Sequence, residues 1–398
     1  MNFILAVNEY KITLLFYSLV FLIVYLNRNK FDVHGKFIFL YRTKIGVNLM
    51  DTIANKARRL IKFLGYLGVL IGFLGMVFTF IMILWLTYKL ILDKSVGGAS
   101  PVIPGLPIAG TGLVFPLITG WIVLFIIILV HEFSHGIVAS AHNIKVKNSG
   151  IAFFGPILGA FVEPDEKSLS KKRHWIQHSI FAAGAFSNFL TVGAVLLIAF
   201  LILNPLGSLL SVSTGVIIFS QPDLPAEKAG IVNNTVVTGI NDKEISTIDD
   251  FREIMEGIGP EENIILKSNE EAYTVTTTVD PEGSSQGYLG VWIIGEKTEL
   301  KNDNAMNAFL FKIIGWFNQF FGWLGFLSLN IGLINLLPIF ITDGARMLKI
   351  SLERLIPDRN RSISIWLFFN WVSVFSLLIL VFLPLFRWLS SILNGILI

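Results

Sequence analysis

The chain contains no cysteine among its 398 residues. Disulfides and thiolate chemistry are therefore excluded, and any metal must be bound by His, Asp, Glu or Asn. Charge is also scarce, since 15% of residues are charged, 54% are hydrophobic and the mean hydropathy is +0.69. This composition is typical of a polytopic membrane protein. The net charge of +3 gives no reason to expect a nucleic-acid partner.

Six apolar runs are long enough to cross the roughly 30 Å hydrocarbon core of a bilayer. They lie at 8–26, 63–92, 113–141, 175–204, 306–338 and 364–392. The first has neither the basic n-region nor the small-residue cleavage site of a signal peptide, so we expect it to be retained. Residues 205–305 hold 17 acidic and 6 basic residues, against 28 and 31 in the whole chain. This split predicts a soluble acidic domain inserted between spans.

Lys and Arg are concentrated in three loops, which alternate with loops that are poor in both residues. The basic loops lie at about 27–62, 145–173 and 346–361. The positive-inside rule places them in the cytoplasm. It places both termini and the acidic domain outside a cell membrane that the chain crosses several times.

The acidic insert reads as short strands and turns. Its β-prone runs are GVIIF, TVVTGI, NIILKS, AYTVTTTV and YLGVWIIG. A short helical turn is expected at 224–230 and an amphipathic helix at 248–255. This order, with the signature Pro-Ala-Glu-Lys-Ala-Gly at 225–230, resembles a PDZ domain, although Asn233-Asn234 stands where Gly-Asp is usual. An unrelated small β-domain is the alternative.

The most informative stretch is His131-Glu132-Phe133-Ser134-His135, which directly follows the uncharged run 111–130. Two histidines at i and i+4 lie on one face of a helix, where both can bind one metal ion. Glu132 is then placed to act as general base on a metal-bound water. Ionisable residues within a span are costly and mark functional sites. We therefore predict peptide-bond hydrolysis below the membrane surface.

Asp343 is the best candidate for the third protein ligand that a hydrolytic zinc site requires. It follows a long apolar stretch broken by Pro338, where a helix must kink or end. An unpaired carboxylate there would be expensive, and a bound cation would offset that cost. The alternatives are an ion pair with Arg346, at i+3, and a helix N-cap.

Other polar residues in the apolar runs leave two interpretations open. Asn188, Asn330 and Asn335 can join helices by amide hydrogen bonds, which is the ordinary role, or hold a substrate backbone or oxyanion. The remaining candidate histidine ligands are weaker, because they sit near membrane exits or lack the paired spacing; they are His142, His174 and His178.

The segment 149–164 is apolar but contains Gly150, Gly155, Pro156 and Gly159, which is unlike a spanning helix. It is expected to form a β-hairpin or a re-entrant loop that dips toward the metal site. Non-helical backbone is tolerated at that depth only inside protein or beside a wet cavity. A plain cytoplasmic loop is the alternative.

Three motifs in order resemble the site-2 protease family of intramembrane zinc metalloproteases. They are His-Glu-x-x-His-Gly at 131–136, Gly-x-x-x-Asn at 184–188 and Asn-x-x-Pro-x-x-x-x-Asp-Gly at 335–344. Thr342 stands where the family usually has Leu. The run Gly-Ala-Phe-Val-Glu at 159–163 is similar to the family's membrane-associated β-segment, and a PDZ-like insert is also familial. The resemblance covers about residues 110–350.

The resemblance implies a site and a substrate class. It implies that Zn²⁺ is bound by His131, His135 and Asp343, that Glu132 activates water, and that Asn188 and Asn335 lie near the scissile bond. The implied substrates are single-span transmembrane proteins in the lipid bilayer, unwound and held by an edge strand of 149–163. The outside domain would either screen bulky ectodomains or bind a new peptide C-terminus.

The sequence thus predicts a polytopic α-helical membrane protein of about six transmembrane helices, with a membrane-associated β-segment and an inserted small α/β PDZ-like domain. Its expected parts are N-terminal helices with a basic cytoplasmic loop (1–110), the first core part (111–204), the extracytoplasmic domain (205–303), the second core part (304–350) and a last helix (351–398).

Two competing functions remain at this stage. The first is a receptor or scaffold that binds partner tails through the PDZ-like domain and holds a structural metal; the intact Glu132 argues against it, because a structural site needs no base. The second is a membrane protease of the other His-Glu-x-x-His type, whose third ligand is a Glu on a following helix. Asp343, in its Asn-Pro context, argues against that one.

Overall fold

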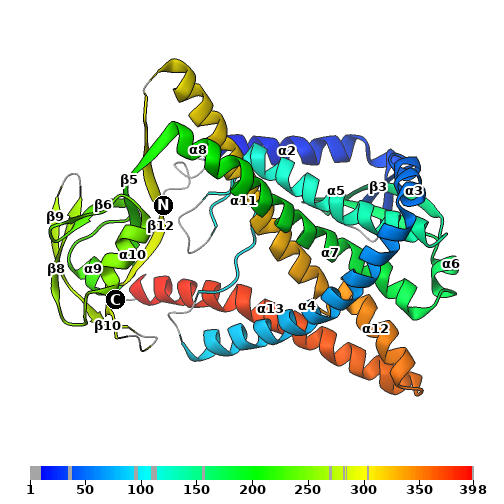
Figure 1. Ribbon diagram of the computed structural model, residues 1–398. Coiled ribbons are helices and arrows are strands. Elements are labelled where there is room, and N and C mark those ends of the chain that lie inside the picture. The colour runs from blue at the N-terminus through cyan, green and yellow to red at the C-terminus, as the bar shows by residue number, and fades with distance from the viewer. Residues whose placement is uncertain are drawn as a thin grey trace. The chain divides into compact units, whose positions relative to one another are not determined.

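The computed structural model describes residues 10–34, 38–93, 97–108, 114–154, 157–268, 271–280, 283, 285–302 and 304–396. The chain divides into two compact units. Residues 1–197 and 319–398 form the first, here called the membrane unit, and residues 198–318 form the second, the inserted unit. Figure 1 labels the elements of both.

Five helices among the described residues are long and apolar enough to cross a membrane. They are α4 (Arg58–Leu92), α5 (Leu117–Ala141), α7 (His174–Ile198) with its continuation through a π-helical turn (Ala199–Leu203) into α8 (Asn204–Leu210), α11 (Ala305–Leu336) and α13 (Arg359–Ile396). The remaining predicted span, 8–26, corresponds to α2 (Lys11–Leu26), which is apolar but has only 16 residues. The amphipathic helix α12 (Asp343–Leu355) lies between α11 and α13. The protein is therefore polytopic.

Glycines on α4 let neighbouring helices pack closely against it. Added Cβ atoms at Gly68, Gly72 and Gly75 would lie 3.2, 3.1 and 2.5 Å from side chains of α7, α12 and α11 respectively. Small residues allow such approach between membrane helices, where packing rather than water exclusion drives association. The site-bearing helices α7 and α12 are thereby fixed on a common support.

Pro384 interrupts the hydrogen bonding of α13, because it has no amide hydrogen to donate to the Leu380 carbonyl four residues earlier. The backbone N–H of Ala99, in the loop after α4, donates to that carbonyl at 3.0 Å. A side chain at Gly98 would overlap both the Leu380 oxygen and the Pro384 ring. The proline thus creates the acceptor by which the loop is attached to α13.

A four-stranded antiparallel sheet belongs to the membrane unit, in the order β1-β2-β3-β4. Its strands are β1 (Asp32–His34), β2 (Ile38–Thr43), β3 (Val146–Phe154) and β4 (Ile157–Pro164), and the short helix α6 (Glu166–Ser170) follows. For residues 149–164, where a β-hairpin, a re-entrant loop or a plain loop was considered, the structure shows the β-hairpin formed by β3 and β4. The basic loop 27–62, to which the sequence analysis assigned no helix or strand, contains a 3-10 turn (Arg28–Lys30), two strands of this sheet and helix α3 (Val47–Lys56).

The inserted unit is a small α/β fold. Its sheet has the order β12-β5-β6-β8-β9, with β7 paired to β6. The strands are β5 (Ser211–Ser220), β6 (Thr235–Ile240), β7 (Lys243–Glu244), β8 (Asn263–Ser268), β9 (Ala272–Thr276) and β12 (Val291–Leu300), while β10 (Thr278–Val279) and β11 (Gly287–Tyr288) pair separately. Helices α9 (Pro225–Lys228) and α10 (Ile248–Glu256) agree with the predicted turn and helix. The PDZ-like assignment stays a prediction.

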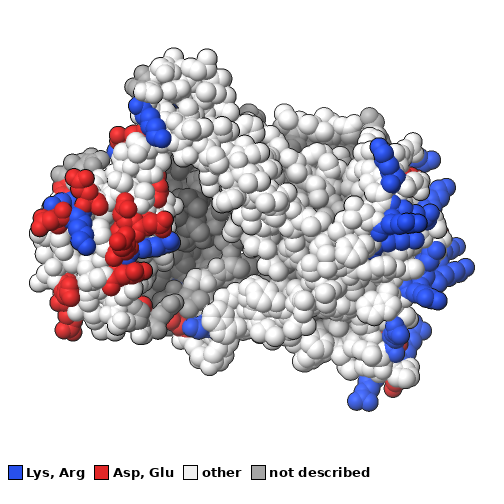
Figure 2. All heavy atoms as spheres, viewed as in Figure 1, with Lys and Arg blue, Asp and Glu red and all other residues white. Residues whose placement is uncertain are grey.

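The two units differ in surface charge. On the inserted unit, Asp and Glu cover much of the face seen in Figure 2. On the membrane unit, Lys and Arg gather at the end formed by α3, α6 and α12, and the flanks of the spanning helices carry almost none (Figure 2). Uncharged flanks are expected where helices face hydrocarbon.

Candidate metal centre

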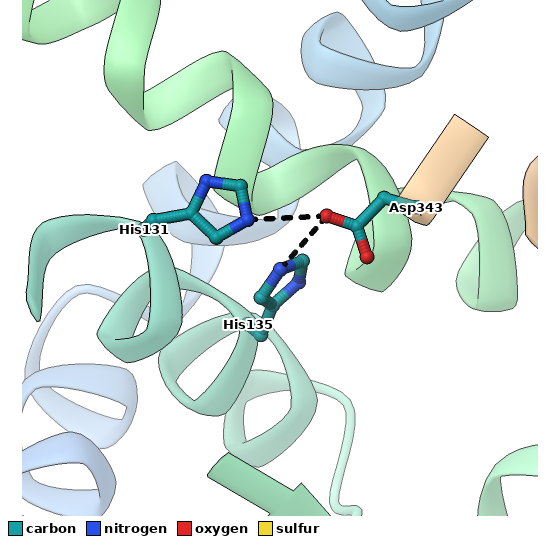
Figure 3. A group of neighbouring side chains, drawn as sticks. All are labelled: His131, His135 and Asp343. Carbon is teal, nitrogen blue, oxygen red and sulfur yellow. Dashed lines mark hydrogen bonds and ion pairs between the residues drawn. The ribbon is translucent and has the colours of Figure 1, made fainter. Parts of the chain in front are cut away.

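Two helices of the membrane unit bring three ligand side chains together (Figure 3). His131 and His135 lie one turn apart on α5 and are 6% and 9% exposed. Asp343, the first residue of α12, is 9% exposed. Its Oδ2 lies 3.2 Å from Nε2 of His131 and 3.1 Å from Nε2 of His135. Sequence positions more than 200 residues apart thus meet at one oxygen.

The spacing of these atoms fits a tetrahedral zinc ion. Zinc–ligand bonds of about 2.0–2.1 Å put two ligand atoms roughly 3.3 Å apart. The observed 3.1 and 3.2 Å are close to that value. Among the described residues, this is the only group of three His, Asp or Glu side chains arranged to hold a metal. Two imidazoles and one carboxylate leave a fourth position open, as a hydrolytic site requires.

The second nitrogen of each imidazole is also engaged. Nδ1 of His135 lies 2.6 Å from the Ile180 carbonyl oxygen, to which it donates, so Nε2 keeps its lone pair for a metal. Nδ1 of His131 lies 3.2 Å from the side-chain amide of Asn188, whose Oδ1 is buried without a partner among the described residues. Turning that amide by 180° brings Oδ1 to Nδ1–H and satisfies both groups. Asn188, which is fully buried, is therefore a partner of a metal ligand.

The glycines of the motifs make room for this arrangement. A Cβ at Gly184 would overlap Nε2 of both His131 and His135, so only glycine lets α7 pass directly beside the ligands. A Cβ at Gly344 would overlap the backbone of Leu336 at the end of α11. Both positions explain why glycine recurs in the patterns around Asn188 and Asp343.

The side chain of Glu132 extends from α5 to the edge of β4. Its Oε2 accepts a hydrogen bond from the backbone N–H of Val162 at 3.1 Å. The two elements pack closely here, since a Cβ at Gly136 would lie 3.2 Å from Cγ1 of Val162. The carboxylate next to the first ligand is thus held by the strand predicted to approach the site.

The start of α12 has a cap that sequence reasoning did not assign. Oγ1 of Thr342 accepts from the backbone N–H of Ala345 at 3.4 Å. A Thr directly before a helix is a recognised N-cap signal, so it could have been found. The guanidinium of Arg346 lies 5.4 Å above the Phe181 ring, and no described ion pair joins it to Asp343. The structure therefore shows neither of the two alternatives for Asp343, an ion pair with Arg346 or a helix N-cap.

Other candidate residues have hydrogen-bond partners outside the three candidate ligands. The side-chain amide of Asn335 donates to the Ile331 carbonyl of its own helix at 3.0 Å, and that of Asn330 donates to Phe326 at 2.7 Å. Nε2 of His178 is 3.4 Å from Oγ of Ser351. None of these contacts involves the metal ligands.

A helix-borne His-Glu-x-x-His site with an Asp ligand, inside a polytopic membrane protein, defines the class of membrane-embedded metallopeptidases. The chain belongs to peptidase family M50, the site-2 protease family, whose sequence model matches residues 119–380. Members of this family are zinc metallopeptidases, which agrees with the donor set.

Similarity to individual relatives covers different parts of the chain. It is 29% identical over 365 residues to the uncharacterized protein MJ0971 of Methanocaldococcus jannaschii, covering 89% of both chains. It is 27% identical to zinc metalloprotease RasP of Oceanobacillus iheyensis over 33% of this chain and 42% of that protein. It is 30% identical to putative zinc metalloprotease R01501 of Rhizobium meliloti over 29% of this chain and 32% of that one. The chain therefore spans less than half of either named protease.

Proposed function

We propose that this protein is a site-2-protease-type intramembrane endopeptidase that uses zinc to hydrolyse peptide bonds in or near transmembrane segments. The observation that carries the proposal is the meeting of two histidines of a span-length helix with Asp343, beside an intact Glu132. A merely structural metal site would need no such carboxylate.

Each residue of the centre has a defined task. His131, His135 and Asp343 hold Zn²⁺. When bound, zinc supplies Lewis acidity toward the scissile carbonyl and makes water more acidic. Glu132 takes the proton of the attacking water and delivers it to the leaving nitrogen. The amide of Val162 orients the Glu132 carboxylate for this transfer.

A transmembrane substrate must unwind before it is cut, because the peptide bonds of a helix are buried and hydrogen-bonded. β4 pairs with β3 along one edge and faces α5 along the other. That second edge pairs with no strand among the described residues, although the Val162 N–H is already bonded to Glu132. An unwound segment added to it near Val162 would lie beside Glu132. Single-span membrane proteins are the substrates that this geometry suits, and Asn335 remains a candidate for contacting their backbone.

The charge pattern supports a cytoplasmic position for the basic end of the membrane unit. The metal centre then lies toward the cytoplasmic side, and both termini and the inserted unit lie outside, with six spans if α2 is included. The inserted unit would either screen substrates by the size of their ectodomains or bind a peptide C-terminus produced by an earlier cut.

The test compares wild type with Glu132→Gln, purified in detergent, on a panel of single-span substrates. Glutamine keeps the shape of the side chain but cannot accept the proton, so cleavage should fall by about 10²–10⁴-fold while bound zinc, measured by mass spectrometry, is unchanged. Glu166→Gln, an exposed Glu→Gln change in α6, is the matched control and should cleave normally. Equal cleavage by Glu132→Gln and wild type would overturn the assignment of the base. Cleavage by neither, with peptide tails bound by the inserted unit, would favour the scaffold.

A further inference from the structure

Glu163 of β4 is held at both carboxylate oxygens. Nη2 of Arg42 lies 2.9 Å from Oε1, and Nε of the same guanidinium donates to Oε1 at 3.0 Å. The side-chain amide of Asn148 donates to Oε2 at 2.9 Å. Arg42 also reaches Asp32 through Nη1, at 2.5 Å. The guanidinium therefore joins the first, second and fourth strands of the sheet.

The register of the sheet explains how a β2 side chain reaches β4. Arg42 is paired with Gly150 of β3, and Gly150 is paired with Phe161 of β4. Gly150 has no side chain, and the Phe161 ring lies over it, since a Cβ there would be 2.6 Å from Cζ of Phe161. Glu163 is paired with Asn148, two residues from Gly150 and so on the same face of the sheet as Arg42. Arg42 and Glu163 are about two-thirds buried, with side chains 32% and 30% exposed. Burial alone would raise the pKa of Glu163, but the hydrogen bonds from Arg42 and Asn148 outweigh it and hold the pKa below its usual value.

The residue before Glu163 contacts the active centre. Val162 donates its backbone N–H to Glu132. A displacement of the Glu163 side chain reaches this amide through the planar 162–163 peptide unit and the Cα of Val162. The position of β4 along α5 therefore decides whether Glu132 keeps its hydrogen bond.

The segment that carries Arg42 is itself anchored on α5. Oγ of Ser149 donates to the Ile45 carbonyl at 2.6 Å, just after β2. Gly46 then turns the chain into α3 with φ of +81°, and a Cβ there would overlap the Phe133 ring of the His-Glu-x-x-His helix. Met50 of α3 is fully buried against Gly136. Contacts thus run from α5 through α3, β2 and β4 and back to α5 at Glu132.

We propose that Arg42 and Glu163 are positioning residues, whose ion pair fixes β4 against α5 and thereby holds Glu132 in its working position. Arg42 lies outside residues 119–380, so the proposal makes the N-terminal segment part of the active centre rather than an appendage to it. It rests on the proposed proteolytic function.

The test is a charge-swap series in the full-length protein. Arg42→Gln and Glu163→Gln should each lower kcat about 10-fold or more, because a small misplacement of a catalytic group is costly. KM should change less than kcat, because these residues act on the position of Glu132 and β4 is only one part of the surface proposed to hold the substrate. Arg42→Lys keeps the charge but loses the forked guanidinium donor, so its kcat should lie between those of wild type and Arg42→Gln. The swap Arg42→Glu with Glu163→Arg should recover part of the lost kcat.

Asp32→Asn is the matched control. It also removes a carboxylate from Arg42, but that carboxylate is 61% exposed and its strand does not touch the centre, so kcat should stay at the wild-type value. Wild-type kcat in Arg42→Gln would overturn the inference. So would a loss of kcat that is matched by lost zinc and a lower unfolding temperature, because that result indicates only a structural role. The proposed function is tested separately, by cleavage in wild type and its loss in Glu132→Gln. If both are observed, a wild-type kcat in Arg42→Gln contradicts only the positioning role.

Discussion

Asn188 illustrates how an uncharged residue can control a metal ligand. A histidine that coordinates through Nε2 must carry its proton on Nδ1, and a partner that accepts from Nδ1 fixes both the tautomer and the ring orientation. Asn188 is the group within reach of Nδ1 of His131, and its own oxygen is otherwise unsatisfied. Its position is therefore better explained by the metal centre than by helix packing alone.

Asn188→Ala is expected to weaken zinc binding by about 10–100-fold, the usual effect of removing a hydrogen-bond partner of a ligating histidine. Affinity would be measured by competition with a chelator in detergent. Asn330→Ala removes the same side chain from a half-buried position whose amide donates to Phe326 of its own helix, so it should bind zinc normally. Unchanged affinity in Asn188→Ala would assign this residue to packing or to the substrate instead.

At the residue scale, the sequence predicted what depends on local spacing. The i, i+4 pattern predicted His131 and His135 as ligands, the cost of a lone carboxylate after an apolar run predicted Asp343, and the structure brings the three side chains together in a group that could hold a metal. The partners of the ligands were not predictable in this way, because Ile180 meets His135 only through the packing of α7 on α5. A hydrogen bond between residues of two different helices produces no periodic pattern in the sequence of either helix.

Helix α10 of the inserted unit begins with a reciprocal cap. Oγ1 of Thr247 accepts from the Asp250 backbone at 3.1 Å, while the Asp250 carboxylate accepts from the backbones of Thr247 at 2.8 Å and Ser246 at 3.0 Å. These hydrogen bonds hold the pKa of Asp250 below its usual 3.8. The part of the cap made by the Asp250 carboxylate therefore stabilises α10 most strongly while Asp250 is ionised, whereas the hydrogen bond to Thr247 Oγ1 does not depend on that charge.

This cap predicts a pH dependence with a definite sign. Because the folded pKa is lower than the unfolded one, the contribution is complete above about pH 4 and is lost as the pH falls through the folded value. Amide hydrogen exchange of α10, corrected for intrinsic rates, should show this loss in wild type and not in Asp250→Asn. Thr247→Ala should lower local protection by about 1 kcal/mol at neutral pH. Asp249→Asn, on an exposed neighbour, should leave protection unchanged, and an identical pH response in Asp250→Asn would contradict the cap's role.

At the element scale, strands with strong local preferences were predicted closely, such as β6 and β8. The strands β1 and β2 were missed because they lie in a segment analysed for its basic residues, and β2 pairs with β3, which is more than 100 residues away. Pairing over such a separation depends on a neighbour that the local pattern does not reveal. The same limit hid α3, whose buried face packs mainly against α5 and also against α4 and β3.

Charge is divided between the parts of the whole molecule. Residues 205–305 hold 17 of the 28 acidic residues but only 6 of the 31 basic ones, and the basic side chains of the membrane unit gather at one end. Positive loops are retained in the cytoplasm, whereas an acidic soluble domain is translocated without difficulty. The basic loops therefore carry the argument for the proposed orientation, and the acidic domain, which can be translocated largely regardless of its charge, does not oppose it.

The absence of cysteine makes this orientation directly measurable, because a single introduced thiol has no native background. Glu256→Cys, at the exposed end of α10, should react with a membrane-impermeant maleimide in intact cells. Asn55→Cys, exposed on α3, should react only after permeabilisation. The two sites serve as controls for each other, since each must label in permeabilised cells. Labelling of Asn55→Cys and protection of Glu256→Cys in intact cells would invert the topology and place the metal centre toward the outer face.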